Sequence, residues 1–246
     1  MPDPSYPAPG TPGQYYPGSP DNQAPEKKKP KYSLCLIITA IIVVISIPIV
    51  AIIAAVAIPA MGVAMDRAKK SADTQNIRML GIALMAEASD SDDQTYPVLR
   101  DKDNPAKTST EVFSYLYEKK SLPSYELVFS PGKDKVKHTG TGKLTSANVG
   151  YNYMKGNKTD KDKGVSMDAD DALPLLWSSG NAPLIVRDGA CTLELLDTGI
   201  WKKSGATVYY KRNNATFKRA TSAGAISEFI PSTFNTRGVS YSELTP

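Results

Sequence analysis

Histidine and cysteine are almost absent from this 246-residue chain, which contains one histidine and two cysteines. A zinc site needs three or four nitrogen, sulfur or carboxylate ligands close together, and these residues do not supply such a set. Cys35 lies in an apolar run far from Cys191, so we expect no disulfide framework. His138 lies in a segment rich in lysine, glycine and threonine that is typical of an exposed loop. We expect neither a metal site nor a cofactor.

A strong excess of basic charge is also missing. The chain carries 29 Lys and Arg residues against 25 Asp and Glu residues. Four of the basic residues (Lys27, Lys28, Lys29 and Lys31) and three of the acidic ones fall within the first 32 residues, which leaves 25 basic and 22 acidic residues in the remainder. A nucleic-acid-binding domain normally concentrates a much larger basic excess. The composition therefore argues against a nucleic-acid partner.

Motifs of known catalytic sites are not found in the sequence. It has no Walker phosphate-binding loop, no Gly-x-Ser-x-Gly and no dinucleotide fingerprint. Paired carboxylates for acid-base chemistry could be drawn only from Glu194, Asp197 and Asp188. Glu194 and Asp197 are three residues apart and do not alternate correctly to share one strand face. We therefore expect no catalytic residues and no enzymatic activity.

Two acidic clusters contain carboxylates of the kind that bind calcium. The first comprises Asp90, Asp92 and Asp93, and the second comprises Asp168, Asp170 and Asp171. Neither matches the EF-hand pattern, which needs a glycine and a distal glutamate at set positions. We expect both clusters to be solvated loops.

The first 26 residues hold eight prolines, mixed with glycine, serine and tyrosine. Proline removes backbone donors and favours extended conformations. We therefore expect residues 1–32 to be a disordered tail that ends in the basic patch. Lysines beside a membrane span normally rest against anionic headgroups.

An apolar run follows, and no charged residue occurs from Ser33 to Met65. These 33 residues would be about 50 Å long as a helix, whereas a hydrocarbon core needs about 20 residues. One helix can therefore span a bilayer, while two spans and a turn would need more than about 40 residues. The run is also too long and too far along the chain for a cleavable secretory signal. We expect a single transmembrane helix over residues 33–65.

This run contains two prolines and several small residues. Pro48 and Pro59 each remove one helical hydrogen bond, so we expect kinks near both. Small residues could form a face for close helix packing, or the alanines could simply be common helix formers; these residues are Ala51, Ala54, Ala55, Ala57, Ala60 and Gly62. Four lysines precede the run and three basic residues follow it closely, which weakly favours a cytoplasmic tail.

The helix is expected to continue beyond the membrane to about Ala88, a total of about 80 Å. A stripe of apolar residues recurs mostly at steps of three or four: Met61, Met65, Ala68, Ala72, Met79, Ala83 and Ala86, widened by Ile77, Leu80 and Leu84. The opposite side is expected to carry Asp66, Arg67, Lys69, Lys70 and Asp73. Residues 89–93 and Pro97 end the pattern.

Beyond Pro97 the pattern predicts a short helix over 111–120, with Val112, Phe113, Leu116 and Tyr117 on one side. Strands are predicted between frequent turns, at 126–129, 149–154, 183–186, 192–196, 206–210 and 215–219. The last two are expected to form a hairpin that turns at Arg212 and Asn213. The predicted fold class is α+β: a long N-terminal transmembrane helix that continues into a small antiparallel sheet, with residues 66–246 as one extracytoplasmic domain.

Several segments resemble the pseudopilins of bacterial type II secretion systems and, more narrowly, a pilin-like family abundant in planctomycetes and verrucomicrobia. The segments that carry the resemblance are Ile58-Pro59-Ala60-Met61, 66–72, 76–84, 90–97, 129–131, 146–153 and 205–217. The resemblance covers most of residues 50–220, and its helical part is the more specific. It implies a pilin-like fold.

The resemblance fails at the site where prepilins are cleaved. The family's peptidase needs a glycine before the cleavage point and a glutamate a few residues into the apolar run. Counted from the basic patch, these positions are Lys31 and Leu36; counted back from Pro59, they are Ile37 and Ile42. Nothing in the sequence therefore supports cleavage or assembly through that glutamate.

The sequence predicts a non-enzymatic, membrane-anchored, pseudopilin-like structural subunit of a type II secretion or pilus-like assembly. Its expected partners are the lipid bilayer and other pilin-like or secretion-system membrane subunits. Its expected location is the inner membrane of a bacterium, with the N-terminus in the cytoplasm and the C-terminal domain in the periplasm. The alternative is a non-polymerising, membrane-tethered binding or sensory module that has kept a pilin-like domain.

Overall fold

The computed structural model describes residues 34–99, 104–131, 135–140, 142–157 and 164–246. The expected tail over residues 1–32, with its basic patch, and Ser33 lie outside the described residues. The chain divides into two compact units, residues 1–56 and 57–246, which are described separately below.

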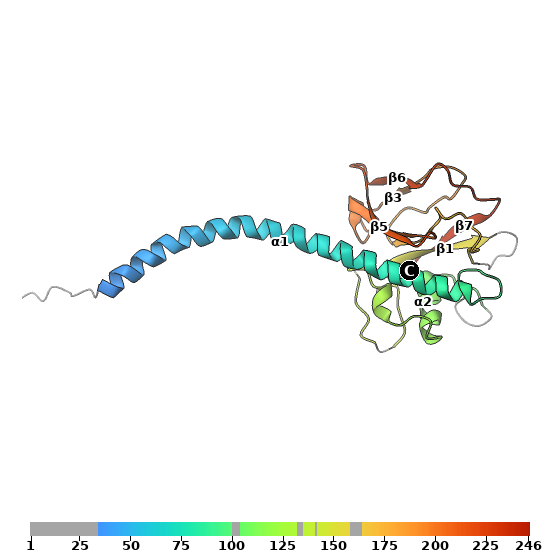
Figure 1. Ribbon diagram of the computed structural model, residues 1–246, viewed down its shortest axis with the longest axis horizontal. Coiled ribbons are helices and arrows are strands. Elements are labelled where there is room, and N and C mark those ends of the chain that lie inside the picture. The colour runs from blue at the N-terminus through green and yellow to red at the C-terminus, as the bar shows by residue number, and fades with distance from the viewer. Residues whose placement is uncertain (1–33, 100–103, 132–134, 141, 158–163) are drawn as a thin grey trace, which may run out of the picture. The chain divides into compact units, whose positions relative to one another are not determined.

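One long helix, α1, runs from Leu34 to Ser89 (Figure 1). Its bounds agree within one residue with the helix predicted from the sequence. It is helical through both Pro48 and Pro59, and the kinks expected there remain predictions. In the first unit, the described residues 34–56 are almost all exposed, including every large aliphatic side chain.

The second unit combines the rest of α1 with a short helix and seven strands. Helix α2 spans Ser109–Glu118, close to its predicted position, and Thr108 caps it by accepting a hydrogen bond from the Glu111 amide at 3.2 Å. Two 3₁₀ turns, η1 (Tyr125–Val128) and η2 (Lys202–Ser204), lie in the loops. The strands are β1 (Tyr151–Asn157), β2 (Pro174–Ser178), β3 (Cys191–Glu194), β4 (Gly205–Tyr210), β5 (Asn214–Arg219), β6 (Ala225–Ile230) and β7 (Ser240–Leu244).

The strands form two antiparallel sheets. Five strands are arranged in the order β5-β4-β2-β1-β7, and β3 pairs with β6 in a separate two-stranded sheet. The unit is therefore α+β with an antiparallel sheet, as the sequence predicts. The β4–β5 hairpin is confirmed: Tyr210 pairs with Asn214, and Asn213 adopts a φ of 60°, which asparagine tolerates better than most residues.

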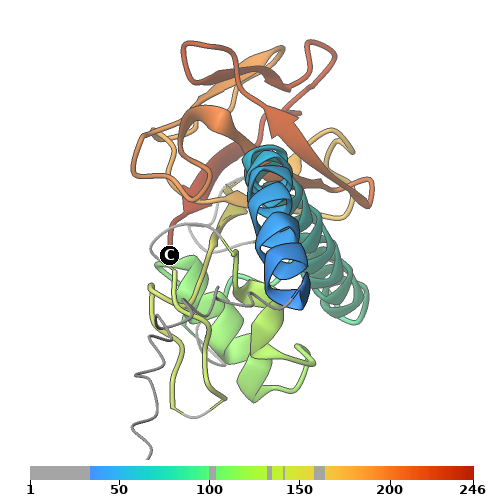
Figure 2. The same ribbon diagram turned by 90° about the vertical axis from the view of Figure 1, so that its left-hand side faces the viewer.

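The side chains on each face of the five-stranded sheet show what covers that face. Tyr151 and Tyr153 of β1 point to the face covered by α1 and α2, where the Phe113 ring lies 6.0 Å from the Tyr153 ring. Trp177 of β2 belongs to the opposite face and meets Phe229 of β6 edge-on, with ring centroids 5.9 Å apart. The five-stranded sheet thus lies between the helices and the two-stranded sheet (Figure 2). Because both faces are covered, every residue of β2 and β4 is buried.

The buried face of α1 differs from the predicted apolar stripe. The buried residues are Asp73, Ile77, Leu80, Gly81, Leu84 and Ala88. Ile77, Leu80 and Leu84 were predicted correctly, but Met61 and Met65 are each 60% exposed. They lie before the point where α1 meets the sheet. The placement of Asp73 on the polar side was wrong, because it continues the buried series one turn before Ile77.

Some strand predictions also fail. Residues 126–129, predicted as a strand, belong mostly to η1, where Ser124 accepts a hydrogen bond from the Glu126 amide and favours a turn. Residues 183–186 form no strand, and Pro183 lacks the amide that a ladder requires. Strands β2, β6 and β7 were not predicted. β2 is covered on both faces and shows no alternation, so period-two reasoning does not find it.

Gly81 marks the closest approach of α1 to the sheet. A Cβ atom at this position would lie 2.3 Å from two ring carbons of Tyr209, a fully buried residue of β4. Gly62 is on the same helix, and a Cβ atom there would meet nothing within 4 Å.

We predict that Gly81→Ala destabilises the domain by about 1–3 kcal/mol, because the fully buried ring of Tyr209 would have to shift to admit the methyl group. Gly62→Ala is the matched control and should be neutral or stabilising by up to about 1 kcal/mol, because alanine is the better helix former. Urea unfolding of the full chain in detergent, followed by tryptophan fluorescence, measures both. Equal effects of the two substitutions would contradict the close packing.

Candidate functional site

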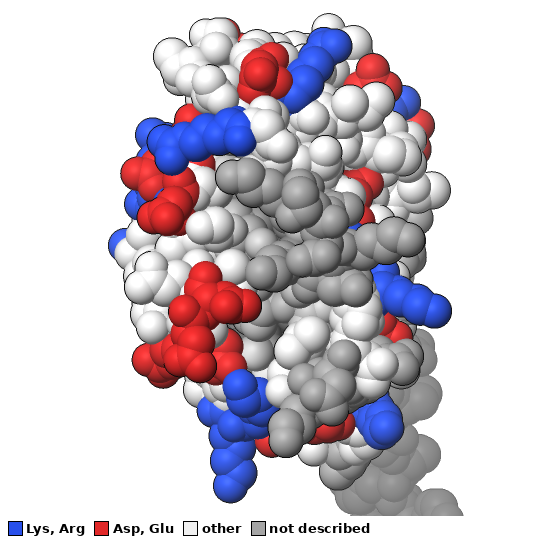
Figure 3. Space-filling view, turned by 90° about the vertical axis from the view of Figure 1, so that its right-hand side faces the viewer, with Lys and Arg blue, Asp and Glu red and all other residues white. Residues whose placement is uncertain are grey.

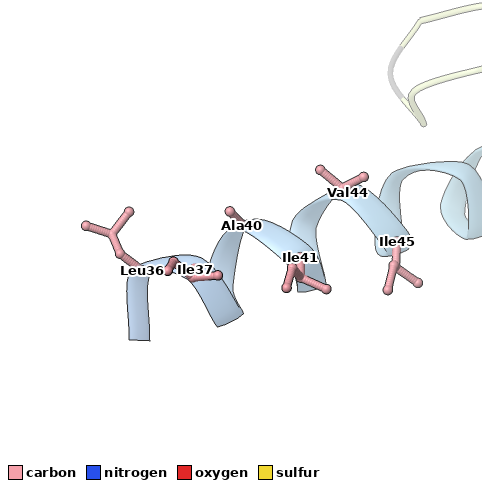
Figure 4. Close-up of a pocket in the computed structure, with 6 residues that line it drawn as sticks. All are labelled: Leu36, Ile37, Ala40, Ile41, Val44 and Ile45. Carbon is pink, nitrogen blue, oxygen red and sulfur yellow. The ribbon is translucent and has the colours of Figure 1, made fainter. Parts of the chain in front are cut away.

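The first candidate site is the exposed apolar surface of α1. An 18-residue window of the helix has a mean hydropathy of 3.2, and none of it is buried. Six carbon-only side chains line a shallow hollow of about 400 Å³ near its start (Figure 4): Leu36, Ile37, Ala40, Ile41, Val44 and Ile45. Among the described residues, α1 alone is long and apolar enough to cross a membrane. This surface makes α1 a possible membrane anchor.

The second candidate site is a buried carboxylate in the second unit, Asp73. It has no exposed surface. Its Oδ1 accepts a hydrogen bond from the Tyr151 hydroxyl at 2.6 Å, and its Oδ2 accepts one from the Trp201 indole Nε1 at 2.7 Å. The Thr207 hydroxyl also donates to Oδ2. Asp73 is therefore held by three donors from outside its own helix.

These donors come from separate parts of the fold. Tyr151 begins β1, Thr207 lies in β4, and Trp201 lies in the loop before η2. Thr207 is itself fixed, because its amide donates to the Ser178 hydroxyl of β2 at 2.9 Å. A single side chain of α1 thus joins the helix to two strands and a loop.

Burial raises the pKa of Asp73 above its ordinary value, because ionisation of a carboxyl group is disfavoured away from water. The hydrogen bonds from Thr207, Tyr151 and Trp201 act in the opposite direction and limit this rise. Burial, together with the neighbouring Asp73, also raises the pKa of Tyr151 well above its usual range, so its hydroxyl remains a donor. The donors compensate part of the cost of burying the carboxyl group.

Ser130 is a further polar group in this region. Its hydroxyl lies near enough to Asp73 to lower the pKa of the carboxyl group. The Ser130 oxygen nevertheless has no hydrogen-bond partner at normal geometry within the described part of the chain. The hydrogen bonds to the Asp73 side chain are therefore those from Tyr151, Trp201 and Thr207.

A second polar cluster, which is partly buried, lies on the opposite face of the five-stranded sheet. Asn181 Oδ1 accepts from Asn152 Nδ2 at 2.7 Å and from Trp177 Nε1 at 3.0 Å. Its Nδ2 donates to Glu243 of β7 at 3.2 Å. Burial raises the pKa of Glu243, and hydrogen bonds from Asn181 and the Leu184 amide oppose the rise. This cluster ties β7 to β1 and β2.

The structure also places the side chains of the two aspartate clusters. No group of three or more His, Cys, Asp or Glu side chains in the described ranges is arranged to hold a metal ion. Asp170 and Asp171 have structural contacts instead, because Asp170 Oδ1 accepts from the Ala172 amide at 2.8 Å and Asp171 pairs with Lys211 at 2.9 Å. Asp92 and Asp93 are exposed in the turn after α1.

The other sequence candidates are scattered. His138 accepts a hydrogen bond from the Gly140 amide at 2.9 Å, and its ring lies 4.2 Å from that of Tyr125. Asp197 pairs with Lys203 at 2.9 Å, and Asp188 accepts from the Thr236 amide at 2.7 Å. These side chains serve local structure.

The charged surface is mixed on the face of the domain shown in Figure 3. Among the residues described on this face, acidic side chains gather in patches, and basic side chains lie next to some of them.

Comparisons of the chain with protein-family models, with curated proteins and with solved structures found no match. Arguments about function therefore rest on the residues and their geometry.

Sequence reasoning did not find the Asp73 cluster. One signal was present: the spacing from Ile77 through Leu80, Leu84 and Ala88 extends back by four residues to position 73. From the sequence alone, an aspartate at that position is expected to face solvent. Its donors could not be identified, because they lie 78 to 134 residues further along the chain.

We predict that Asp73→Asn destabilises the domain by about 1–3 kcal/mol, because an amide NH₂ would face donors that need an acceptor. Asp66→Asn is the matched control on the same helix, where an exposed pair with Lys70 is lost; its effect should stay below about 1 kcal/mol. Urea unfolding in detergent measures both. An Asp73→Asn protein as stable as the wild type would show that the cluster does not hold the helix.

Proposed function

We propose that this protein is a non-enzymatic, membrane-anchored structural subunit of the pseudopilin type, associated with a type II secretion or pilus-like assembly. The observation that carries the proposal is that the two parts of α1 have different environments. No residue of its apolar 18-residue window is buried, whereas residues 73–88 pack one face against the α+β domain. An exposed aliphatic surface of this size needs lipid or partner helices around it.

The contacts of the domain support a structural role. Among the described residues, the least solvent-accessible carboxyl group is that of Asp73, which joins the helix to the sheet and has no exposed surface. The resemblance of residues 58–61, 66–72 and 76–84 to pseudopilins supports the same proposal.

The proposed location is the inner membrane of a bacterium, crossed once. The excess of lysines before the span supports, through the positive-inside tendency, an N-terminus in the cytoplasm and a domain in the periplasm. The proposed partners are the bilayer and other pilin-like or secretion-system membrane subunits.

A second candidate function is a membrane-tethered binding or sensory module that does not polymerise. The observation that favours it is the missing glycine and glutamate of the prepilin peptidase site. Both candidates share the anchor and differ in whether α1 contacts other helices in the membrane.

The anchor is tested by adding charge to the apolar run. Ile45→Arg with Ile52→Arg leaves no uncharged stretch longer than the 13 residues 53–65. Each arginine near the centre of a span disfavours insertion by about 2.5–3.5 kcal/mol. We predict that the wild-type chain resists alkaline extraction from membranes and that the double variant is released.

The matched control places two arginines at exposed apolar residues of the domain, Ile185→Arg with Val136→Arg. This control should remain in the membrane fraction. Release of wild-type protein without detergent would refute the anchor.

Assembly is tested by disulfide crosslinking in membranes, with Cys35 replaced by serine. Ala51 and Ala55 lie about one turn apart on the small-residue face, and Ile53 lies about half a turn away. We predict that Ala51→Cys and Ala55→Cys crosslink efficiently to a neighbouring membrane helix and that Ile53→Cys does so several-fold less.

Chains that remain monomeric at all three positions would exclude the structural-subunit proposal and favour the tethered module. Equal crosslinking at all three positions would indicate random collision and would also count against a specific assembly.

A further inference from the structure

A cationic groove lies beside the turn of α1 that follows the apolar run. The groove is a hollow of about 360 Å³ between Asp66, Lys69 and Lys70 on one side and Trp201, Lys202 and Ser204 on the other. All of these residues belong to the second unit.

Positive charge in the groove is only partly neutralised. Lys70 pairs with Asp66 at 2.8 Å, and its ammonium group lies 4.6 Å from the centre of the Phe217 ring. Lys69 and Lys202 are exposed and have no ion-pair partner within the described part of the chain. The side chains that line the groove thus carry three positive charges and one negative charge.

The Asp73 cluster fixes one wall of this groove. Trp201 donates its indole hydrogen to Asp73, and its carbonyl accepts from the Ser204 hydroxyl at 2.6 Å. Lys202, between them, has a φ of 50°, which is uncommon for a residue other than glycine. The lysine is therefore presented from a well-defined turn.

The groove is placed at the depth of lipid headgroups if the bilayer extends to the end of the apolar run. Ile58, Met61 and Met65 are each at least 60% exposed, and lipid is the environment that favours them. Lys69 and Lys70 follow Met65 by about 6–8 Å of helix. The headgroup layer on one side of a bilayer is about 5–8 Å thick.

We propose that this groove binds the phosphate of an anionic phospholipid headgroup, through Lys69 and Lys202, and holds the domain against the membrane surface. The inference rests on the proposed membrane anchor. A lipid is favoured over a free phosphate ion because the groove directly follows the apolar run. In the proposed arrangement, the headgroups of the bilayer around α1 lie next to the groove.

The test uses the full chain in detergent micelles with equal amounts of phosphatidylglycerol and phosphatidylcholine of the same acyl chains. Native mass spectrometry counts the lipids that the protein retains. We expect the wild type to retain more phosphatidylglycerol than phosphatidylcholine. In the double variant Lys69→Gln with Lys202→Gln, this ratio should fall by about fivefold for each lysine removed. The N-terminal lysines are unchanged in all variants, so they do not contribute to the difference.

Two further variants control for charge and folding. Lys107→Gln with Lys120→Gln removes the same charge from exposed positions outside the groove and should keep the wild-type preference. Lys69→Arg with Lys202→Arg should also keep it. An equal loss in the Lys107/Lys120 variant would show non-specific attraction and overturn the proposal.

Inorganic phosphate added in large excess, without phospholipid, distinguishes the source of the anion. Stable phosphate adducts that require Lys69 and Lys202 would assign the groove to a free anion and overturn the lipid proposal. If the chain needs detergent but shows no preference for phosphatidylglycerol, lipid binding by the groove is refuted and the membrane anchor is not. A chain that is soluble without detergent would refute the anchor itself.

Discussion

The hydrogen bonds at Asp73 are the interaction on which the rest of this structure depends. A helix can slide or rotate on a sheet when only aliphatic side chains join them, because hydrophobic contact is not directional. A buried carboxyl group that accepts from Tyr151, Trp201 and Thr207 fixes both the rotation and the position of α1. Gly81 then allows the next turns to approach the ring of Tyr209.

This arrangement explains how one helix can have both an exposed apolar part and a part that packs in the core of a domain. Residues up to Met65 carry aliphatic side chains that are suited to lipid or to other helices, while one face of the helix from Asp73 onward is buried in the α+β domain. Between them lie Lys69, which is exposed, and Lys70, which pairs with Asp66. The proposed phosphate site would give Lys69 and Lys202 a counter-charge at that level of the helix.

The sequence predicted α1, α2 and the β4–β5 hairpin, because each has a strong local signal: a long charge-free run, an amphipathic stretch, or alternating residues on either side of an asparagine turn. It did not predict β6 or β7, nor β2, which is covered on both faces and shows no alternation. The Asp73 cluster could not be predicted either, since an aspartate among polar neighbours gives no sign of a tyrosine, a tryptophan and a threonine that meet it only after folding.

The central claim is that a single helix is both the anchor and a core element of the domain. Hydrogen exchange of backbone amides, measured on the full chain in lipid nanodiscs, tests it most directly. Slow exchange over residues 40–88 without a gap is the result that this account predicts, because the bilayer protects the first part of α1 and the sheet protects the last. Rapid exchange over the turns between Ala57 and Asp73 would show that the helix is broken there and would contradict it.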